Sequence, residues 1–172
     1  RSCAALGIVL LLAACGGTSD GRGSDVQGGD GVVVASARDG DTLLLLDGRR
    51  VRLVQVDAPE LGDGECYGRK ALLELAALVA PGARVELERD PRLDDVDRFG
   101  RLLRYVRRDG KLVNLELVRR GAAAPYFFGG ARGRHADALL AAAREAKAER
   151  RGLWGACPST ALLPERSVSA RP

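Results

Sequence analysis

Three Asp-Gly pairs constrain this chain more than any other feature, because each follows or separates runs of β-type residues. The pairs at 39–40 and 47–48 divide residues 32–57 into three apolar runs, and the pair at 109–110 follows a further run. Asp-Gly between such runs is the strongest short-range signal for a hairpin turn. The pairs therefore predict a three-stranded antiparallel meander over residues 32–57, with its third strand at residues 50–56.

The rest of the folded part is expected to supply two more strands and three helices. Strands are expected at 85–89 and 102–107, and helices at 67–80, near 112–120 and near 135–150. Three strands, a helix, two strands and further helices follow the order of an OB-fold barrel with added C-terminal helices. A closed barrel also leaves no long open strand edge. We therefore predict an α+β fold, mainly β: a five-stranded OB-fold barrel with three helices.

The composition bounds the possible functions. A chain of 172 residues is long enough for one domain with a sizeable core and too short for two ordinary domains. Lys and Arg outnumber Asp and Glu by 27 to 23, which suits an anionic partner such as nucleic acid, although the Ala, Gly and Arg bias also fits genomic base composition. One histidine and few aromatic residues argue against a histidine-cluster metal site and a broad base-stacking platform.

Residues 1–15 are interpreted as a signal peptide. An apolar run over residues 3–15 follows Arg1 and is shorter than the roughly 20 residues needed to span a bilayer. It ends in the string LAAC, which resembles a bacterial lipobox. That resemblance implies a lipid on Cys15 and an exported protein anchored to the extracytoplasmic face of the cell membrane. A buried helix and a plain secretion signal are the alternatives.

Two further segments lack the pattern of a folded core. Residues 16–30 are rich in Gly, Ser, Thr and Asp and predict a flexible linker. Residues 158–172 contain several prolines and no hydrophobic period, and predict a disordered tail. The folded domain is therefore expected over residues 31–157, and a monomer is the default expectation.

The cysteines of the expected domain form an even pair. Cys3 leaves with the signal peptide and Cys15 takes the lipid, so Cys66 and Cys157 remain. An exported protein folds in an oxidising compartment, and one disulfide is the simplest outcome. Two unrelated buried thiols are the alternative. A zinc site is disfavoured, because two cysteines and His135 make a poor tetrahedral set.

Five charged residues mark the expected strand ends and turns: Asp41, Arg52, Asp57, Glu60 and Arg101. Singly, each has a structural interpretation, such as a turn aspartate that bonds its own backbone or a strand arginine paired with a nearby carboxylate. Together, two aspartates and backbone carbonyls offer the hard oxygen ligands that Ca²⁺ prefers. A glutamate can orient or deprotonate a water, and two arginines can bind phosphate oxygens. The set suits phosphodiester hydrolysis.

Three segments carry a family resemblance. The strings DGDT at 39–42, VRLVQVDAPE at 51–60 and DRFGR at 97–101 resemble, in order and spacing, the signature segments of the staphylococcal nuclease family. The resemblance covers about residues 31–157. It implies a Ca²⁺-dependent nuclease on an OB-fold barrel, which cuts DNA and RNA with little sequence preference.

The resemblance also implies a role for each site residue. Ca²⁺ ligation falls on Asp41, Asp57 and the backbone carbonyl of Ala58, water activation on Glu60, and phosphate binding and transition-state stabilisation on Arg52 and Arg101. Arg98 and Tyr126 are candidate substrate contacts, with core packing as the alternative for Tyr126. Two departures stand out: Ala58 replaces a frequent threonine, and Phe99 replaces a tyrosine that can contact a terminal phosphate.

Two other classes of function are weighed against a nuclease. A non-catalytic OB-fold that only binds nucleic acid or a protein partner would be expected to lack the metal ligands and arginines, whereas all five charged residues are present. A purely structural lipoprotein would need no proximity among Asp41, Asp57 and Glu60. For a nuclease, alanine at Arg52, Glu60 or Arg101 is expected to lower turnover while the fold survives.

Overall fold

The computed structural model describes Arg1, residues 31–62 and residues 65–170. Apart from Arg1, the expected signal peptide, the lipobox with Cys15 and the expected linker at 16–30 lie outside the described residues. None of the helices in the described ranges is long and apolar enough to cross a membrane.

Five strands close into a barrel, as predicted. They are β1 (Val32–Ala37), β2 (Thr42–Leu45), β3 (Arg50–Leu53), β5 (Arg84–Glu88) and β6 (Leu102–Arg108). Antiparallel pairings join β1 to β2 and β5, β2 to β3, and β5 to β6. The parallel pairing of β3 with β6 closes the ring, so the OB-fold prediction is confirmed.

Two short pairings extend the barrel. β7 (Lys111–Leu112) returns on β6 through the Asp-Gly turn at 109–110, and β4 (Val56–Asp57) pairs with β8 (Ala124–Pro125). The predicted single strand at 50–56 is wrong, because it breaks at Gln55, whose φ is 65°. The chain turns there, so Arg52 and Asp57 lie on two different strands that face one site.

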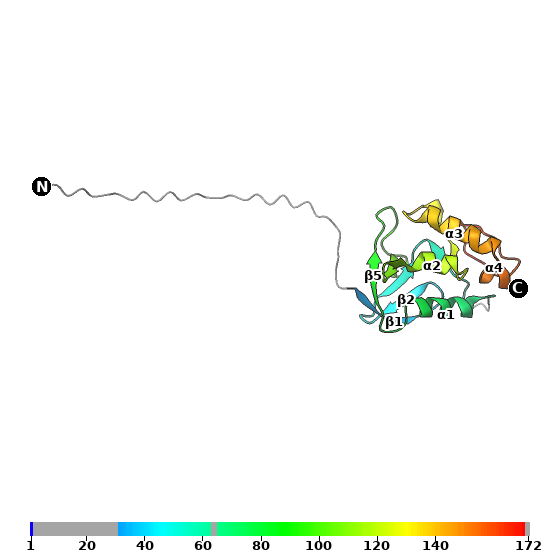
Figure 1. The fold of residues 1–172 in the computed structure, drawn as a ribbon, viewed down its shortest axis with the longest axis horizontal. Coiled ribbons are helices and arrows are strands. Elements are labelled where there is room, and N and C mark those ends of the chain that lie inside the picture. Colours follow the sequence, from blue (N-terminus) through cyan, green and yellow to red (C-terminus); the bar gives the residue numbers. More distant parts are fainter. Residues whose placement is uncertain (2–30, 63–64, 171–172) are drawn as a thin grey trace.

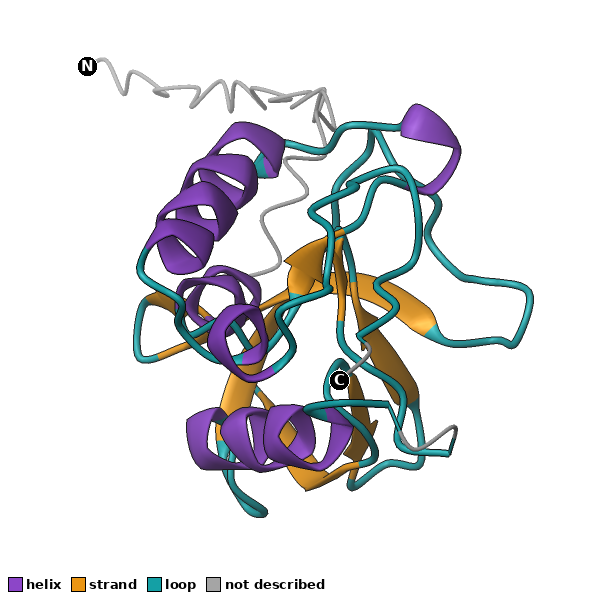
Figure 2. Ribbon diagram, turned by 90° about the vertical axis from the view of Figure 1, so that its right-hand side faces the viewer, coloured by secondary structure: helices purple, strands orange, loops and turns teal. Residues whose placement is uncertain are grey.

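The three long helices occur where the sequence predicts them. They are α1 (Gly68–Leu78), α2 (Val113–Arg119) and α3 (Ala136–Ala148), and they lie along one flank of the strands (Figure 2). A fourth helix, α4 (Leu153–Ala156), and a 3-10 turn, η1 (Phe128–Gly130), were not expected. Both are too short to show a hydrophobic period in the sequence.

The core lies between the barrel and the helices α1, α2 and α3. Leu43 and Val51 from the barrel, Leu75 from α1, Leu117 from α2 and Leu139 from α3 are fully buried in it. Figure 1 shows α1 and α2 beside the strands that they cover. This packing gives the strand ends that carry the charged residues a rigid support.

The C-terminal segment differs from the predicted disordered tail. Residues 158–170 pack against the domain, and Val168 and Ala170 are buried in an apolar cluster with Trp154. Leu153 of α4 belongs to the same cluster. The prediction is wrong for this segment because two alternate apolar residues are too short a pattern to detect. Backbone hydrogen bonds to residues far away in the sequence add to their packing.

The disulfide between Cys66 and Cys157 is confirmed, with an S–S distance of 2.07 Å. It joins the residues just before α1 to the end of α4.

Replacement of Cys66 and Cys157 together by serine is expected to lower the free energy of unfolding by about 4 kcal/mol, because the bond closes a long loop in the unfolded chain. The two cysteines are 91 residues apart in the sequence. Urea denaturation of the variant beside the oxidised protein measures the loss. Reduction of the native protein should reproduce it, and an unchanged denaturation midpoint would contradict this account of the disulfide.

Candidate active site

Arg52 lies at the centre of the site, on β3 and opposite Thr42 of β2. Its side chain is only 12% exposed. Nη1 donates to the carbonyl oxygens of Leu53 (2.8 Å) and Val56 (2.6 Å), which the bend at Gln55 brings within reach. These two bonds fix the position of the guanidinium.

The same guanidinium contacts two buried carboxylates through Nη2. This nitrogen lies 2.6 Å from Oδ1 of Asp57 and 3.1 Å from Oδ2 of Asp41. The two aspartates are 7% and 6% exposed. The interpretation of Arg52 as the centre of an internal ion pair is therefore confirmed, and the contact also brings two carboxylates into one small region.

The turn before β2 aims Asp41 at this region. Its backbone N–H donates to Oδ1 of Asp39 (3.0 Å), which makes the turn that the sequence predicts. Its carboxylate accepts from the Thr42 hydroxyl (3.1 Å) and from the Ala58 N–H (2.9 Å). Gly40 allows the close approach, since a Cβ there would lie 2.5 Å from that of Ala58.

The two carboxylates carry more negative charge than their one cation balances. Burial raises the pKa of Asp41 to about 7, although the positive charge of Arg52 acts to lower it. Burial raises the pKa of Asp57 as well, again against the effect of Arg52. A second cation beside these carboxylates would favour their ionised forms.

The oxygen donors around Arg52 suit Ca²⁺ better than they suit a metal ion that needs three or more side-chain ligands. Within residues 31–62 and 65–170, no group of three or more His, Cys, Asp or Glu side chains is placed to hold a metal ion. An ion here would take the carboxylates of Asp41 and Asp57, the carbonyl of Ala58 and water. Ca²⁺ accepts carbonyls and waters in irregular geometry, so this donor set suits it.

Glu60 lies at the exposed edge of the same loop, three residues after Asp57. Its backbone is fixed on both sides: the N–H donates to Oε2 of Glu65 (3.0 Å), and Gly68 of α1 lies directly against its carbonyl. Partial burial, followed by the negative charges of Asp39 and Asp57, raises the pKa of Glu60. A raised pKa makes its carboxylate a stronger proton acceptor.

Arg101 approaches the site from the loop before β6. Asp97 accepts from its Nε (2.6 Å) and from its backbone N–H (2.9 Å). Nη1 lies 3.4 Å from the hydroxyl oxygen of Thr42, which itself donates to Asp41. Partial burial acts to raise the pKa of Asp97, but the hydrogen bonds from Arg101 outweigh it and lower that pKa.

The two candidate substrate contacts lie farther out. Arg98 stacks on the ring of Phe99, at 4.7 Å from the ring centroid, and Phe99 is 55% exposed. Tyr126 is half-buried just after β8, and its N–H donates to the Gln55 carbonyl (3.0 Å). Arg98 follows the aspartate that holds Arg101, and Tyr126 follows the strand that pairs with β4. Their contact with substrate stays a prediction.

Sequence reasoning missed the residues that hold the charged side chains in place. Thr42 and Asp97 fall inside the signature segments, and Asp97 precedes by four residues the arginine that it binds. Val168 lies outside them, and its N–H donates to Oδ2 of Asp57 (2.8 Å). A backbone donor exists at nearly every residue, so no side-chain pattern could have indicated this one.

Comparisons with known proteins agree with the geometry of the site. The family model described as "Staphylococcal nuclease homologue" matches residues 50–156. Endonuclease YhcR of Bacillus subtilis (strain 168) is 31% identical over 137 residues, which cover 71% of this chain and 11% of the relative. Endonuclease YncB of the same organism is 33% identical over 130 residues, covering 72% and 61%. Protein ParB of Escherichia coli is 36% identical over 129 residues, covering 67% of each chain. The chain thus spans less than two thirds of either Bacillus endonuclease.

Replacement of Arg52 by methionine is expected to destabilise the fold, because it leaves Asp41 and Asp57 buried without their cation. The geometry thus revises the expectation that variants at Arg52 fold normally. At about pH 8 the free energy of unfolding should fall by about 3–5 kcal/mol. The loss should shrink as the pH falls toward about 5, since protonation relieves carboxylates whose pKa values burial has raised. Urea denaturation in a chelator at both pH values measures this.

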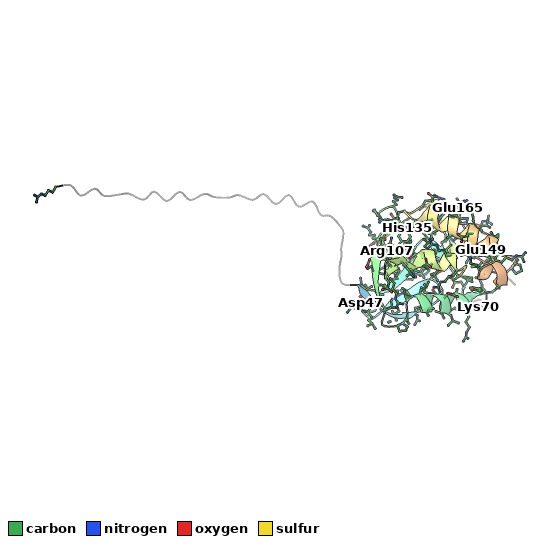
Figure 3. All side chains as sticks on the ribbon, viewed as in Figure 1. Asp47, Lys70, Arg107, His135, Glu149 and Glu165 are labelled. Atoms are coloured by element: carbon green, nitrogen blue, oxygen red, sulfur yellow. A yellow bond between two sulfur atoms is a disulfide. The ribbon has the colours of Figure 1, made fainter. Side chains whose placement is uncertain are left out.

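Arg49→Met is the matched control. Arg49 pairs with Asp47, which lies at the outer edge of the folded body (Figure 3), and the two side chains are 51% and 46% exposed. Loss of this surface pair should cost less than about 1 kcal/mol. Equal losses in the two variants, or a loss at Arg52 that is independent of pH, would argue against a buried ion cluster.

Proposed function

Because the chain belongs to the staphylococcal nuclease family, we propose that it is a Ca²⁺-dependent nuclease that hydrolyses phosphodiester bonds of DNA and RNA with little sequence preference. The observation that carries the proposal is the buried cluster of Asp41, Arg52 and Asp57, with Glu60 and Arg101 at its edges. Two of the similar proteins are named endonucleases, which supports the class of reaction.

The proposed reaction is attack of water on a phosphodiester. When bound by Asp41, Asp57 and the Ala58 carbonyl, Ca²⁺ would supply positive charge to the phosphate oxygens and acidify a bound water. Glu60 orients the attacking water and accepts its proton. The water oxygen bonds to phosphorus, one ester P–O bond breaks, and the departing oxygen takes up a proton.

The two arginines offset the charge that develops on the phosphate. Asp97 holds the Nε edge of Arg101, so its terminal nitrogens on the side of Thr42 can bind phosphate oxygens. Arg52 has its Nη1 fixed by two backbone carbonyls and therefore presents its charge from a constant position. A fixed positive charge needs no rearrangement when the five-coordinate phosphorus forms.

Replacement of Glu60 by glutamine is expected to lower kcat by about 10²-fold or more, because the amide cannot accept the proton. Cleavage of single-stranded DNA and RNA in saturating Ca²⁺ measures this, and a chelator should abolish cleavage by the unaltered protein. Glu74→Gln is the control: Glu74 lies on α1, its side chain pairs with Arg120 (2.9 Å), and the variant should retain full activity. Arg101→Lys in the same assay tests the phosphate contact. DNA that binds and stays intact would favour a non-catalytic binding module instead.

Ca²⁺ should raise the Tm more at about pH 8 than at about pH 5, because ligand carboxylates must be ionised to bind it. Burial raises the pKa of Asp41 to about 7, so protons compete with the ion at the lower pH. Differential scanning calorimetry with and without Ca²⁺ measures the shift. Equal shifts at both pH values, or an undiminished shift in Asp41→Asn, would place the ion elsewhere.

We also propose that the protein is exported and anchored to the extracytoplasmic face of the cell membrane by a lipid on Cys15. The lipobox-like string before Cys15 supports this, as does the disulfide, since such bonds persist in oxidising compartments. Cells fed a clickable fatty acid should label the unaltered protein and not Cys15→Ser. Equal labelling of the two would remove Cys15 as the lipid site.

A further inference from the structure

Two backbone hydrogen bonds fix the ends of residues 164–170, here termed the strap. Near its start, the Phe127 N–H donates to the Pro164 carbonyl (2.6 Å), and at its end the Cys66 N–H donates to the Ala170 carbonyl (3.0 Å). Phe127 lies shortly after β8, and Cys66 lies just before α1. The strap therefore spans the side of the site that is formed by β4 and β8.

Apolar contacts hold the strap against the domain between these bonds. Val168 is 8% exposed and Ala170 1% exposed, and both pack in one cluster with Leu153, Trp154 and Cys157. Burial of the two side chains makes the strap part of the folded domain.

The middle of the strap contacts Asp57. The Val168 N–H donates to Oδ2 of Asp57 (2.8 Å), and this bond is buried. The other oxygen, Oδ1, accepts from Nη2 of Arg52 (2.6 Å). Among the described residues, each carboxylate oxygen thus has one protein donor, and the two donors together fix the rotation of the carboxyl group. Because a carboxylate oxygen can accept more than one interaction, both oxygens retain capacity for a cation.

We propose that Val168 is a positioning residue that holds Asp57 in the orientation that binds Ca²⁺. The inference rests on the proposed function, because it concerns the same metal site. Partners that orient a metal ligand reduce the ordering needed when the ion binds, and their loss weakens binding. The strap thereby makes the C-terminal segment part of the metal site, although it lies outside all three signature segments.

Replacement of Val168 by proline tests this directly, since proline lacks the N–H and keeps an apolar side chain. Isothermal titration calorimetry should show Ca²⁺ affinity about tenfold weaker or more. At saturating Ca²⁺ the kcat for DNA cleavage should recover, because the Val168 N–H acts only through its bond to Asp57 and supplies no group to the proposed reaction. Ser167→Pro is the matched control, because Ser167 is exposed and its N–H has no protein acceptor in the described part of the chain. The Ca²⁺ affinity of this variant should stay within about twofold of that of the unaltered protein.

A second variant covers the case in which Val168→Pro does not fold. Removal of residues 161–172 eliminates the strap and keeps the disulfide between Cys66 and Cys157, and it should cause the same loss of Ca²⁺ affinity. Circular dichroism and thermal melting in a chelator report whether each variant is folded.

The outcomes separate this inference from the proposed function. Folded strap variants that bind Ca²⁺ as the unaltered protein does would overturn the inference and leave the nuclease proposal standing. Tighter binding would also overturn it, because the strap would then compete with the ion. An unaltered protein that neither binds Ca²⁺ nor cleaves DNA would overturn the proposed function, and the inference with it.

Discussion

The contact of one arginine nitrogen with two buried carboxylates determines the arrangement of the site. Asp41 comes from the turn before β2 and Asp57 from β4, and Nη2 of Arg52 joins them. A buried charge without a partner is costly, so each of the three groups depends on the other two. The tight turn at 39–41 and the bend at Gln55 are both needed for this contact. The ion cluster therefore links local backbone geometry to the chemistry of the site.

The barrel and the helices supply the rigid surroundings that such a cluster needs. Pairing of β2 with β3 places Thr42 opposite Arg52, and the loop before β6 brings Arg101 to the Thr42 hydroxyl. Asp97 and the strap add contacts from two other parts of the chain. Two buried carboxylates that could hold a cation, a carboxylate at an exposed edge and a guanidinium held by an aspartate then lie together, and this combination suits hydrolysis of a phosphodiester.

The sequence predicts the parts of the molecule whose signals are local. Asp-Gly turns indicate the hairpins, and the signature segments contain Asp41, Asp57 and the other charged residues of the site. The bend at Gln55 could not be predicted in this way, because its positive φ accompanies hydrogen bonds to residues far along the chain. The side-chain amide of Gln55 donates to the Ala131 carbonyl (2.9 Å) and accepts from the Gly133 N–H (2.7 Å). The contact of the strap with the site could not be predicted from the sequence either, since a backbone N–H rather than a side chain makes it.

A crystal structure with Ca²⁺ and a deoxynucleotide bearing a terminal phosphate would test the proposed calcium and phosphate sites most directly. We expect the ion on the carboxylates of Asp41 and Asp57 and the carbonyl of Ala58, with the terminal nitrogens of Arg101 on phosphate oxygens. An ion bound elsewhere, or a phosphate that contacts neither Arg52 nor Arg101, would contradict this proposal and leave the buried cluster as a purely structural feature of the barrel.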